Sequence, residues 1–272
     1  MLTLVPQGGL CNRLRAIMSV LSLVEEGIID TDVHVGWHVS SECAARFDLL
    51  FQPLEAARLK IAPRRWYDRP ITRYNLHWPE LVRSFTYFAQ YSNVPPAVEE
   101  LQGHIAAGRS VYVSTGQAFC EYSPEYVRRL RLQPHLQQRV NKLSAHFDDH
   151  TIGVHIRRTD HVKAIAESPD NLFEQAMRQA LEDDPKANFF IASDDPHLRT
   201  HLAALFPGRA TIQTCRGTRS DLQGMEEGAV DLWTLARCSR IMGSYWSSYS
   251  DTAAEIGGIP LTIIRKSETA KS

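Results

Sequence analysis

The chain has 272 residues, 43% of them hydrophobic and 22% charged, a composition typical of a globular protein and a length that suits one large domain or two small ones. Its 30 basic and 31 acidic residues give a formal net charge of -1, which argues against the basic surface that duplex nucleic acid or an anionic membrane requires. No apolar run approaches the ~20 residues of a membrane span, and the opening MLTLVPQGG lacks the features of a signal peptide, so we expect a cytoplasmic protein without a membrane span.

The first predicted elements are a strand at residues 2–5, a tight turn at Gly8 and Gly9, and a helix whose apolar residues keep helical spacing from Leu14 to Val24. Further strands are expected at 32–39, 59–62 and 110–114. Residues 63–100, with several Trp, Tyr and Pro residues, are predicted to be irregular. Their loops either shape an acceptor surface or pack on their own aromatic side chains.

The second half of the chain alternates strands with helices. Connecting helices are expected between residues 123 and 147, followed by a boundary between an N-terminal domain, 1–148, and a C-terminal domain, 149–272. Strands are then expected at 151–156, 188–192, 210–214, 240–245 and 261–264, with helices at 171–181, 197–206, 229–238 and 249–256 between them. Such crossover connections indicate a parallel sheet with helices on both faces.

Ligands of open parallel sheets bind outside the carboxyl ends of the strands, so the residues after each strand are the functional candidates. The first such segment, residues 8–13, is neither a GxGxxG nor a GxxxxGK[ST] motif. Its glycines either let the backbone approach a ligand or form a plain tight turn. The other three segments are 155–160, 193–196 and 247–250.

The segment HIRRTD places Arg157 and Arg158 at the mouth of a central strand, where a charge needs a partner. That partner is either a phosphate, which the guanidinium fork fits, or an internal carboxylate, Asp160 or Asp194. His155 is either a core histidine or part of the site. No set of metal ligands accompanies it, and the five cysteines are scattered without a CxxC spacing, so we expect no metal and no disulfide framework.

Ser247 and Ser248 precede a predicted helix, whose N-terminus attracts anions. Ser248 and Asp251 also fit a capping box. Asp231 is predicted to lie in the first turn of the helix that opens at Ala229, where the helix dipole favours a carboxylate. The same carboxylate is a candidate to accept hydrogen bonds from guanine.

Four segments together resemble motifs of a superfamily that contains α1,6-fucosyltransferases, rhizobial nodulation fucosyltransferases, α1,2-fucosyltransferases and protein O-fucosyltransferases. HIRRTD at 155–160 resembles the HxRRxD motif of the α1,6 group, and FFIASDDPHL at 189–198 resembles its strand followed by a DDP turn. Residues 229–256 resemble its final motif, an acidic helix start that leads to a strand and then to the pair SS. GGLCNRLRA at 8–16 resembles the glycine-rich, Asn-containing N-terminal loop of the wider group. The resemblance covers the C-terminal half in order and the first turn of the N-terminal half.

The resemblance implies an α/β fold of GT-B type, two Rossmann-like domains with parallel sheets facing a central cleft. It also implies an inverting, metal-independent glycosyltransferase, without a cofactor, that moves fucose from GDP-fucose to a glycan or another hydroxyl acceptor. The resemblance implies that Arg157 contacts the β-phosphate, that Asp231 contacts guanine and that His155 helps to place the base. It also implies that the diphosphate is held by Ser247, Ser248 and Tyr249, and that Asn12 approaches the donor from the opposite domain. Gly9, Arg158 and Asp194 complete the expected substrate-binding set.

The chain departs from the α1,6 pattern after HxRRxD, because His161 and Ile165 stand where that group has a lysine and a glutamate. The nearest carboxylates, Asp160 and Glu167, are therefore the candidates for the catalytic base. Two alternatives stay open: a GT-B transferase that uses another GDP-sugar such as GDP-mannose, and a catalytically silent nucleotide-binding or glycan-binding module of the same fold.

Overall fold

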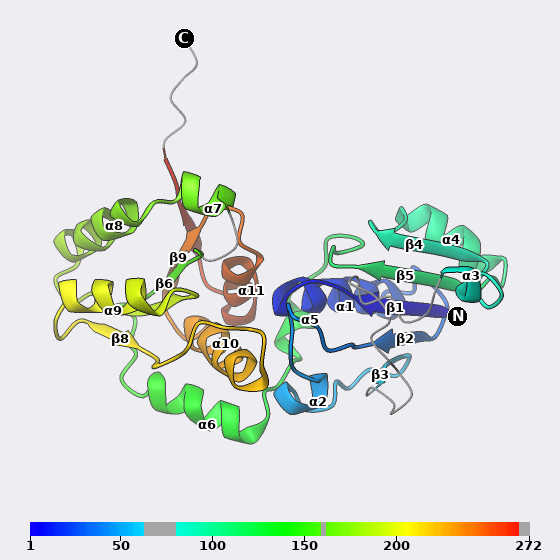
Figure 1. Cartoon of the computed structure of the whole chain (residues 1–272), viewed down its shortest axis with the longest axis horizontal. Helices are drawn as coiled ribbons and strands as arrows, with labels where there is room; N and C mark the ends of the chain where they lie inside the picture. Colours follow the sequence, from blue (N-terminus) through cyan, green and yellow to red (C-terminus); the bar gives the residue numbers. More distant parts are fainter. Residues whose placement is uncertain (63–79, 159–161, 267–272) are drawn as a thin grey trace, which may run out of the picture. The chain divides into compact units, whose positions relative to one another are not determined.

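The computed structural model describes residues 1–62, 80–158 and 162–266. The chain divides into two compact units (Figure 1): unit 1 contains residues 1–133 and 219–225, and unit 2 contains 134–218 and 226–272. Unit 2 begins earlier in the chain than the residue 149 expected from the sequence. The segment from 134 to 148 packs on the second sheet, with the ring of Phe147 5.8 Å from that of Phe190.

Unit 1 is built around a parallel sheet of five strands in the order β3-β2-β1-β5-β4. Its elements in chain order are β1 (Leu2–Pro6), α1 (Leu10–Glu25), β2 (Val33–Gly36), α2 (Phe47–Leu50), β3 (Leu59–Ala62), α3 (Glu80–Arg83), β4 (Ala89–Asn93), α4 (Val98–Ala106), β5 (Val111–Thr115) and α5 (Pro124–Arg128). The strands β1 and β5 are buried at every position, which is typical of the centre of a sheet covered on both faces.

Unit 2 contains a second parallel sheet, in the order β10-β9-β6-β7-β8. Its elements are α6 (Pro134–Leu143), β6 (Thr151–Ile156), α7 (Val162–Glu167), α8 (Asp170–Asp183), β7 (Asn188–Ser193), α9 (Pro196–Leu205), β8 (Ala210–Ile212), most of α10 (Leu222–Leu235), β9 (Arg240–Ser244), α11 (Ser248–Gly257) and β10 (Leu261–Ile264). Residues 222–225 of α10 are counted with unit 1. The predicted α/β class, with a parallel sheet in each of two Rossmann-like domains, is confirmed.

The two faces of the second sheet have different packing. On one face, α8 and α9 place Phe173, Met177 and Leu202 against Val154 and Ile191 of the central strands. On the other face, glycines in the strands let helices approach closely. A Cβ at Gly153 would lie 2.9 Å from Leu235 of α10, and one at Gly243 would lie 2.6 Å from the Ser250 hydroxyl of α11.

Most predicted strands and helices are present, and three differences matter. The region expected to be irregular, 63–100, contains α3, β4 and part of α4, while 63–79 lie outside the described residues. Helix α7 was not predicted, because six residues are too few to show a clear helical period. Helix α10 begins at Leu222 and not at Ala229, since the stretch before Ala229 is polar and lacks an obvious cap.

Candidate functional site

The carboxyl ends of β6, β7 and β9 lie side by side in unit 2, because these strands are neighbours in a parallel sheet. They end at Ile156, Ser193 and Ser244. The predicted segments 193–196 and 247–250 and residues 155–158 of the predicted segment 155–160 are therefore brought to one edge of the sheet, while residues 159 and 160 lie outside the described part of the chain. This edge is the candidate site.

His155 is buried at the end of β6, where its Nδ1 lies 2.7 Å from the Ser250 hydroxyl. Its ring stacks on Tyr249, with centroids 4.6 Å apart and an interplanar angle of 25°. Burial is the main cause that lowers the pKa of His155 to about 3, and the nearby arginines add to it against the opposing charge of Asp194. The imidazole is thus neutral at pH 7, with one nitrogen used by Ser250.

The stacked ring of Tyr249 is fixed from α10, since its phenol donates to the Gly228 carbonyl at 2.5 Å. Gly243 has no side chain, so Ser250 can lie close enough to β9 to reach His155. The position of the histidine therefore depends on a strand glycine and on the start of α11. The sequence segment that contained Ser250 was recognised, but this contact was not.

Arg157 follows His155 at the strand end, and its backbone N–H donates to the Ser244 hydroxyl at 2.9 Å. Its Nε lies 3.4 Å from Asp194 Oδ2, and the side chain is 21% exposed. Asp194 also accepts a hydrogen bond from the Arg158 backbone at 2.7 Å. The internal carboxylate considered from the sequence is present, and the guanidinium beside it still reaches solvent.

The Arg158 side chain turns toward the start of α8 and is 11% exposed. Its Nε donates to Asp170 at 2.6 Å and one terminal nitrogen donates to the Ser168 carbonyl at 2.8 Å. The guanidinium also lies 5.9 Å from the Phe173 ring. These contacts favour a structural role, in which Arg158 ties β6 to α8.

Helix α11 starts one residue earlier than the predicted capping box requires. Ser247 is its N-cap and makes no side-chain capping bond, so the expected box of Ser248 and Asp251 is wrong. Ser247 is buried and Ser248 is half-buried. The helix N-terminus keeps the dipole that attracts an anion, and it lies directly after β9.

Asp231 lies in the middle of α10, because this helix begins nine residues before it, at Leu222. The prediction that it occupies a first turn and is favoured by the helix dipole is wrong. Asp231 is 4% exposed, and its Oδ2 accepts from Arg199 at 2.7 Å while its Oδ1 accepts from Gln213 at 2.8 Å. Guanine recognition by Asp231 stays a prediction, and it would use the lone pairs that these partners leave.

Arg199 and Gln213 were missed from the sequence. Arg199 is 3% exposed and also donates to the carbonyls of Ser193, at 2.5 Å, and Gln213, at 3.1 Å. Burial raises the pKa of Asp231 against the pull of Arg199. Burial also acts to lower the pKa of Arg199, but the charge and the hydrogen bond of Asp231 oppose it, and this pKa is raised overall. We regard the pair as charged, given its contact distance and its further donors. Asp231 is the only charged residue in the apolar stretch AVDLWTLA, and a carboxylate buried in such a helix needs a partner, so this pattern in the sequence indicated a buried cation.

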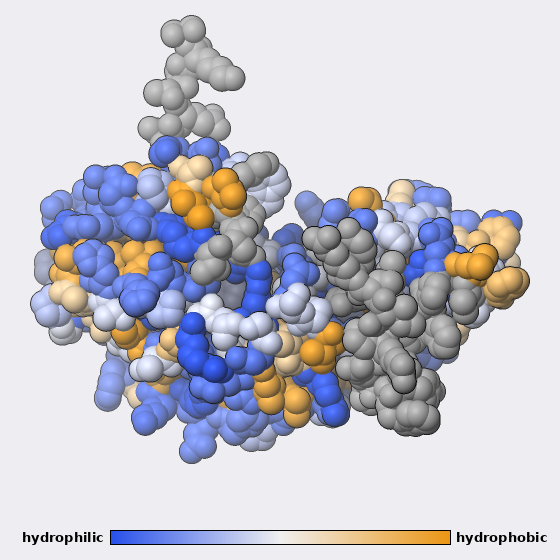
Figure 2. Space-filling view, in the orientation of Figure 1, coloured by the Kyte–Doolittle hydropathy of each residue, from blue (hydrophilic) through white to orange (hydrophobic). Residues whose placement is uncertain are grey.

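Of the two candidates for a catalytic base, Asp160 lies outside the described residues. Glu167 is exposed at the end of α7, where its carbonyl accepts from the Lys266 N–H at 2.8 Å. The same helix exposes Val162 and Ile165, by 81% and 42%, and Figure 2 shows apolar residues gathered over it. Ile165 thus presents an apolar side chain at the position where the α1,6 pattern has a glutamate.

Gly9 and Asn12 lie together in unit 1, after β1. Gly9 is the N-cap of α1, and a Cβ at Gly8 would lie 3.1 Å from Asn12 Nδ2. Gly8 has a φ of 77°, a conformation that favours glycine. The left-handed turn that leads into the helix thus accounts for Gly8, whereas Gly9 has an extended backbone with a φ of -72°.

Among the described residues, no helix is both long enough and apolar enough to cross a membrane. In the same part of the chain, His, Cys, Asp and Glu side chains form no group of three that could hold a metal ion. All five cysteines lie among the described residues, and none of them forms a disulfide.

No family model matches the chain, and no curated protein matches it in sequence. Solved structures do match its fold over almost its whole length. The NodZ alpha-1,6-fucosyltransferase soaked with GDP-fucose is 16% identical over 94% of this chain and 92% of its own, with a TM-score of 0.60. POFUT1 in complex with GDP-fucose is 12% identical over 97% of both chains, with a TM-score of 0.57.

A further structure, the fucosyltransferase NodZ from Bradyrhizobium, is 17% identical over 93% of this chain and 91% of its own, with a TM-score of 0.56. At these identities the likeness shows a shared fold. Almost the whole chain, and not only its C-terminal half, therefore has the fold of fucosyltransferase structures, which confirms the predicted GT-B type.

Proposed function

We propose that the chain is an inverting glycosyltransferase that moves fucose from GDP-fucose to a glycan or another hydroxyl acceptor. The observation that carries the proposal is the guanidinium of Arg157 at the carboxyl end of β6, flanked by the neutral His155 and Asp194. The fold shared with structures that contain GDP-fucose supports the choice of donor.

In the proposed reaction, the bond between C1 of fucose and a β-phosphate oxygen breaks while the acceptor hydroxyl attacks the opposite face of the sugar. Negative charge grows on the β-phosphate, and a preorganised guanidinium stabilises this charge more in the transition state than before it. Arg157 supplies that guanidinium without a resident metal in this proposal. Ser247, Ser248 and Tyr249, at the start of α11, hold the diphosphate through the N-terminus of the helix.

The remaining roles concern the base of the nucleotide and the acceptor proton. A neutral His155 offers its second ring nitrogen as a hydrogen-bonding group, while its stack on Tyr249 fixes the ring plane. Asp231 is proposed to recognise guanine, and Gly9 and Asn12 are proposed to contact the donor. Asp160 or Glu167 takes the proton of the acceptor, so that the products are the fucoside, GDP and a proton.

The test compares Arg157→Ala and Arg157→Lys with Arg178→Ala, a matched arginine that is 55% exposed and pairs with Glu174 on α8. We expect GDP to raise the Tm of the parent more than UDP or ADP does, with or without chelator. Arg157→Ala should lower turnover, read as donor hydrolysis where no acceptor is supplied, about 10² to 10³-fold with a small change in Tm. Lysine should restore only part of it, because an ammonium lacks the forked geometry.

Three outcomes would contradict the proposal. If Arg157→Ala lost stability and activity only in proportion to folded protein, Arg157 would be a structural partner of Asp194. Equal Tm shifts with all three nucleotides would argue against a guanine donor. GDP binding by the parent without any turnover of GDP-fucose, even to hydrolysis, would identify a silent binding module.

A further inference from the structure

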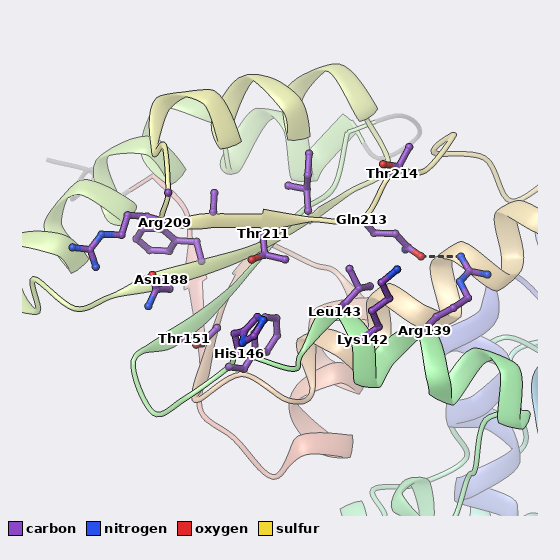
Figure 3. A pocket seen from close by; sticks show the side chains of 15 residues that line it. Arg139, Lys142, Leu143, His146, Thr151, Asn188, Arg209, Thr211, Gln213 and Thr214 are labelled. Carbon is purple, nitrogen blue, oxygen red and sulfur yellow. Dashed lines mark hydrogen bonds between the residues drawn. The ribbon is translucent and has the colours of Figure 1, made fainter.

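A pocket of about 760 Å³ lies in unit 2 between α6 and the edge strand β8 (Figure 3). This volume is within the range of sites for small molecules, roughly 300 to 1,000 Å³. The pocket reaches Thr151 and Asn188, the first residues of β6 and β7, whereas the candidate site lies at the other ends of these strands. Thr151 and His155 are four strand positions apart, or about 13 Å.

The lining of the pocket is basic. Arg139, Lys142, His146 and Arg209 contribute to it, and none of the described residues that line it is acidic. Arg139 and Lys142 are three positions apart on α6 and therefore share one face of the helix. Figure 3 shows Arg139, Lys142 and His146 beside the strand, near Thr211 and Gln213. A concave wall of one charge raises the local concentration of ions of opposite charge.

Two of these side chains are held in place and two are available. Arg139 donates to Gln213 Oε1 at 2.8 Å and lies 3.6 Å from Glu226, and Arg209 lies 3.5 Å from the Ala187 carbonyl. Lys142 and His146 are exposed and make no hydrogen bond or ion pair with the described part of the chain. The polar groups of these two side chains are therefore not used by the described part of the fold.

The rest of the lining is polar at one side and apolar at the other. Thr151, Asn188 and Thr211 supply hydroxyl and amide groups, which can exchange hydrogen bonds with the hydroxyls of a sugar. Leu143, Phe147 and Ile212 supply apolar surface for the C–H face of a ring. An anion on a polyhydroxyl ring matches all three kinds of lining group.

We propose that this pocket binds a small anionic carbohydrate, with its phosphate or carboxylate against Lys142 and His146 and its hydroxyls toward Thr151, Asn188 and Thr211. The site is separate from the one at the carboxyl ends and does not depend on fucosyl transfer. The side chain of Gln213 links the two sites, since it accepts from Arg139 and donates to Asp231 at 2.8 Å. An anion that draws Arg139 away would therefore change a hydrogen bond of Asp231.

The experiment measures binding of glucose 6-phosphate, glucuronate, inorganic phosphate and neutral glucose to the full chain by calorimetry and thermal shift. We expect saturable binding of at least one of the two anionic sugars, weaker binding of phosphate, and none of glucose. Lys142→Glu should raise the Kd about tenfold or more, because a like charge then faces the anion. Lys266→Glu, a matched exposed lysine after β10 at the opposite edge of the sheet, should leave the Kd unchanged.

Lys142 is exposed, so its variants are expected to fold, and an unchanged GDP shift in Lys142→Glu checks this directly. Preference for glucose 6-phosphate would identify a phosphate-bearing ligand, and preference for glucuronate a carboxylate-bearing one. No binding of any anionic sugar, or an unchanged Kd in Lys142→Glu, would overturn the proposal. Binding that is lost in Arg157→Ala and kept in Lys142→Glu would also overturn it, because the anion would then occupy the carboxyl-end site.

Discussion

Replacing Arg199 by methionine should destabilise unit 2 strongly, because it removes the cation from a buried pair and leaves the carboxylate. The side chains of Arg199 and Asp231 are 3% and 6% exposed, with 2.7 Å between Nη2 and Oδ2. Water cannot replace the lost partner, and breaking one side of such a pair typically costs about 3 to 5 kcal/mol. Gln213 would still donate to Asp231, which keeps the expected loss within that range. Urea titration gives the free energy of unfolding.

The double variant Arg199→Met with Asp231→Leu removes both charges while it keeps apolar side chains in their place, so it separates the effect of an unpaired buried charge from the effect of lost packing. It should lose much less stability than Arg199→Met alone, because an apolar replacement of a buried ion pair is often close to neutral. The Nε of Arg199 has no hydrogen-bond partner among the described residues, so the native pair is itself imperfectly satisfied. If both variants lost the same free energy, or if Arg199→Met lost less than about 1 kcal/mol, the energetic reasoning would be refuted.

Two further predictions concern the position of His155. The pKa of His155 is about 3 in the folded chain, below the ordinary 6.5, so the unfolded chain binds the proton first as the pH falls. The free energy of unfolding should therefore fall by about 1.4 kcal/mol per pH unit between pH 6.5 and pH 3. His155→Gln should flatten this slope in denaturation curves, and an equal slope would contradict the burial of a neutral ring. Gly243→Ala should cost about 1 to 3 kcal/mol and weaken GDP binding, because its Cβ would press on Ser250 at 2.6 Å. Gly228→Ala is the control, since nothing lies within 4 Å of its Cβ; equal stability of the two variants would refute the close approach.

The sequence predicted the second sheet well, because each of its strands is a short apolar run that follows a helix of regular period. The strand ends followed from that alternation, and so did the shared edge of segments 155–158, 193–196 and 247–250. The start of α10 did not follow, since helix propensity without an apolar period or a cap gives no clear boundary. The error moved Asp231 from an assumed first turn into the middle of a helix.

The pairing of the charges could not be predicted either, because it depends on which side chains meet across the sheet. HIRRTD offered Asp160 and Asp194 as partners for its arginines, and Asp194 does contact Arg157, yet Arg158 pairs with Asp170 of α8. Arg199 lies only five residues after Asp194, yet it is outside every segment that was expected in the site. A buried carboxylate in an apolar helix indicates that a partner exists, and only the fold shows which one.

The charge arrangement at the carboxyl ends constrains how a diphosphate could bind there. Within the described residues, the cations of Arg157 and Arg199 are each matched by a carboxylate, and His155 is neutral. The edge of the sheet therefore presents little net positive charge to an anionic ligand. Affinity for a diphosphate has to come from directed donors, namely the Arg157 guanidinium and the backbone N–H groups at the start of α11, which are already oriented by Asp194 and by the helix. Such donors lose their effect when their geometry shifts, so residues that only position them, such as Gly243 and Ser250, become as important for binding as the arginine itself.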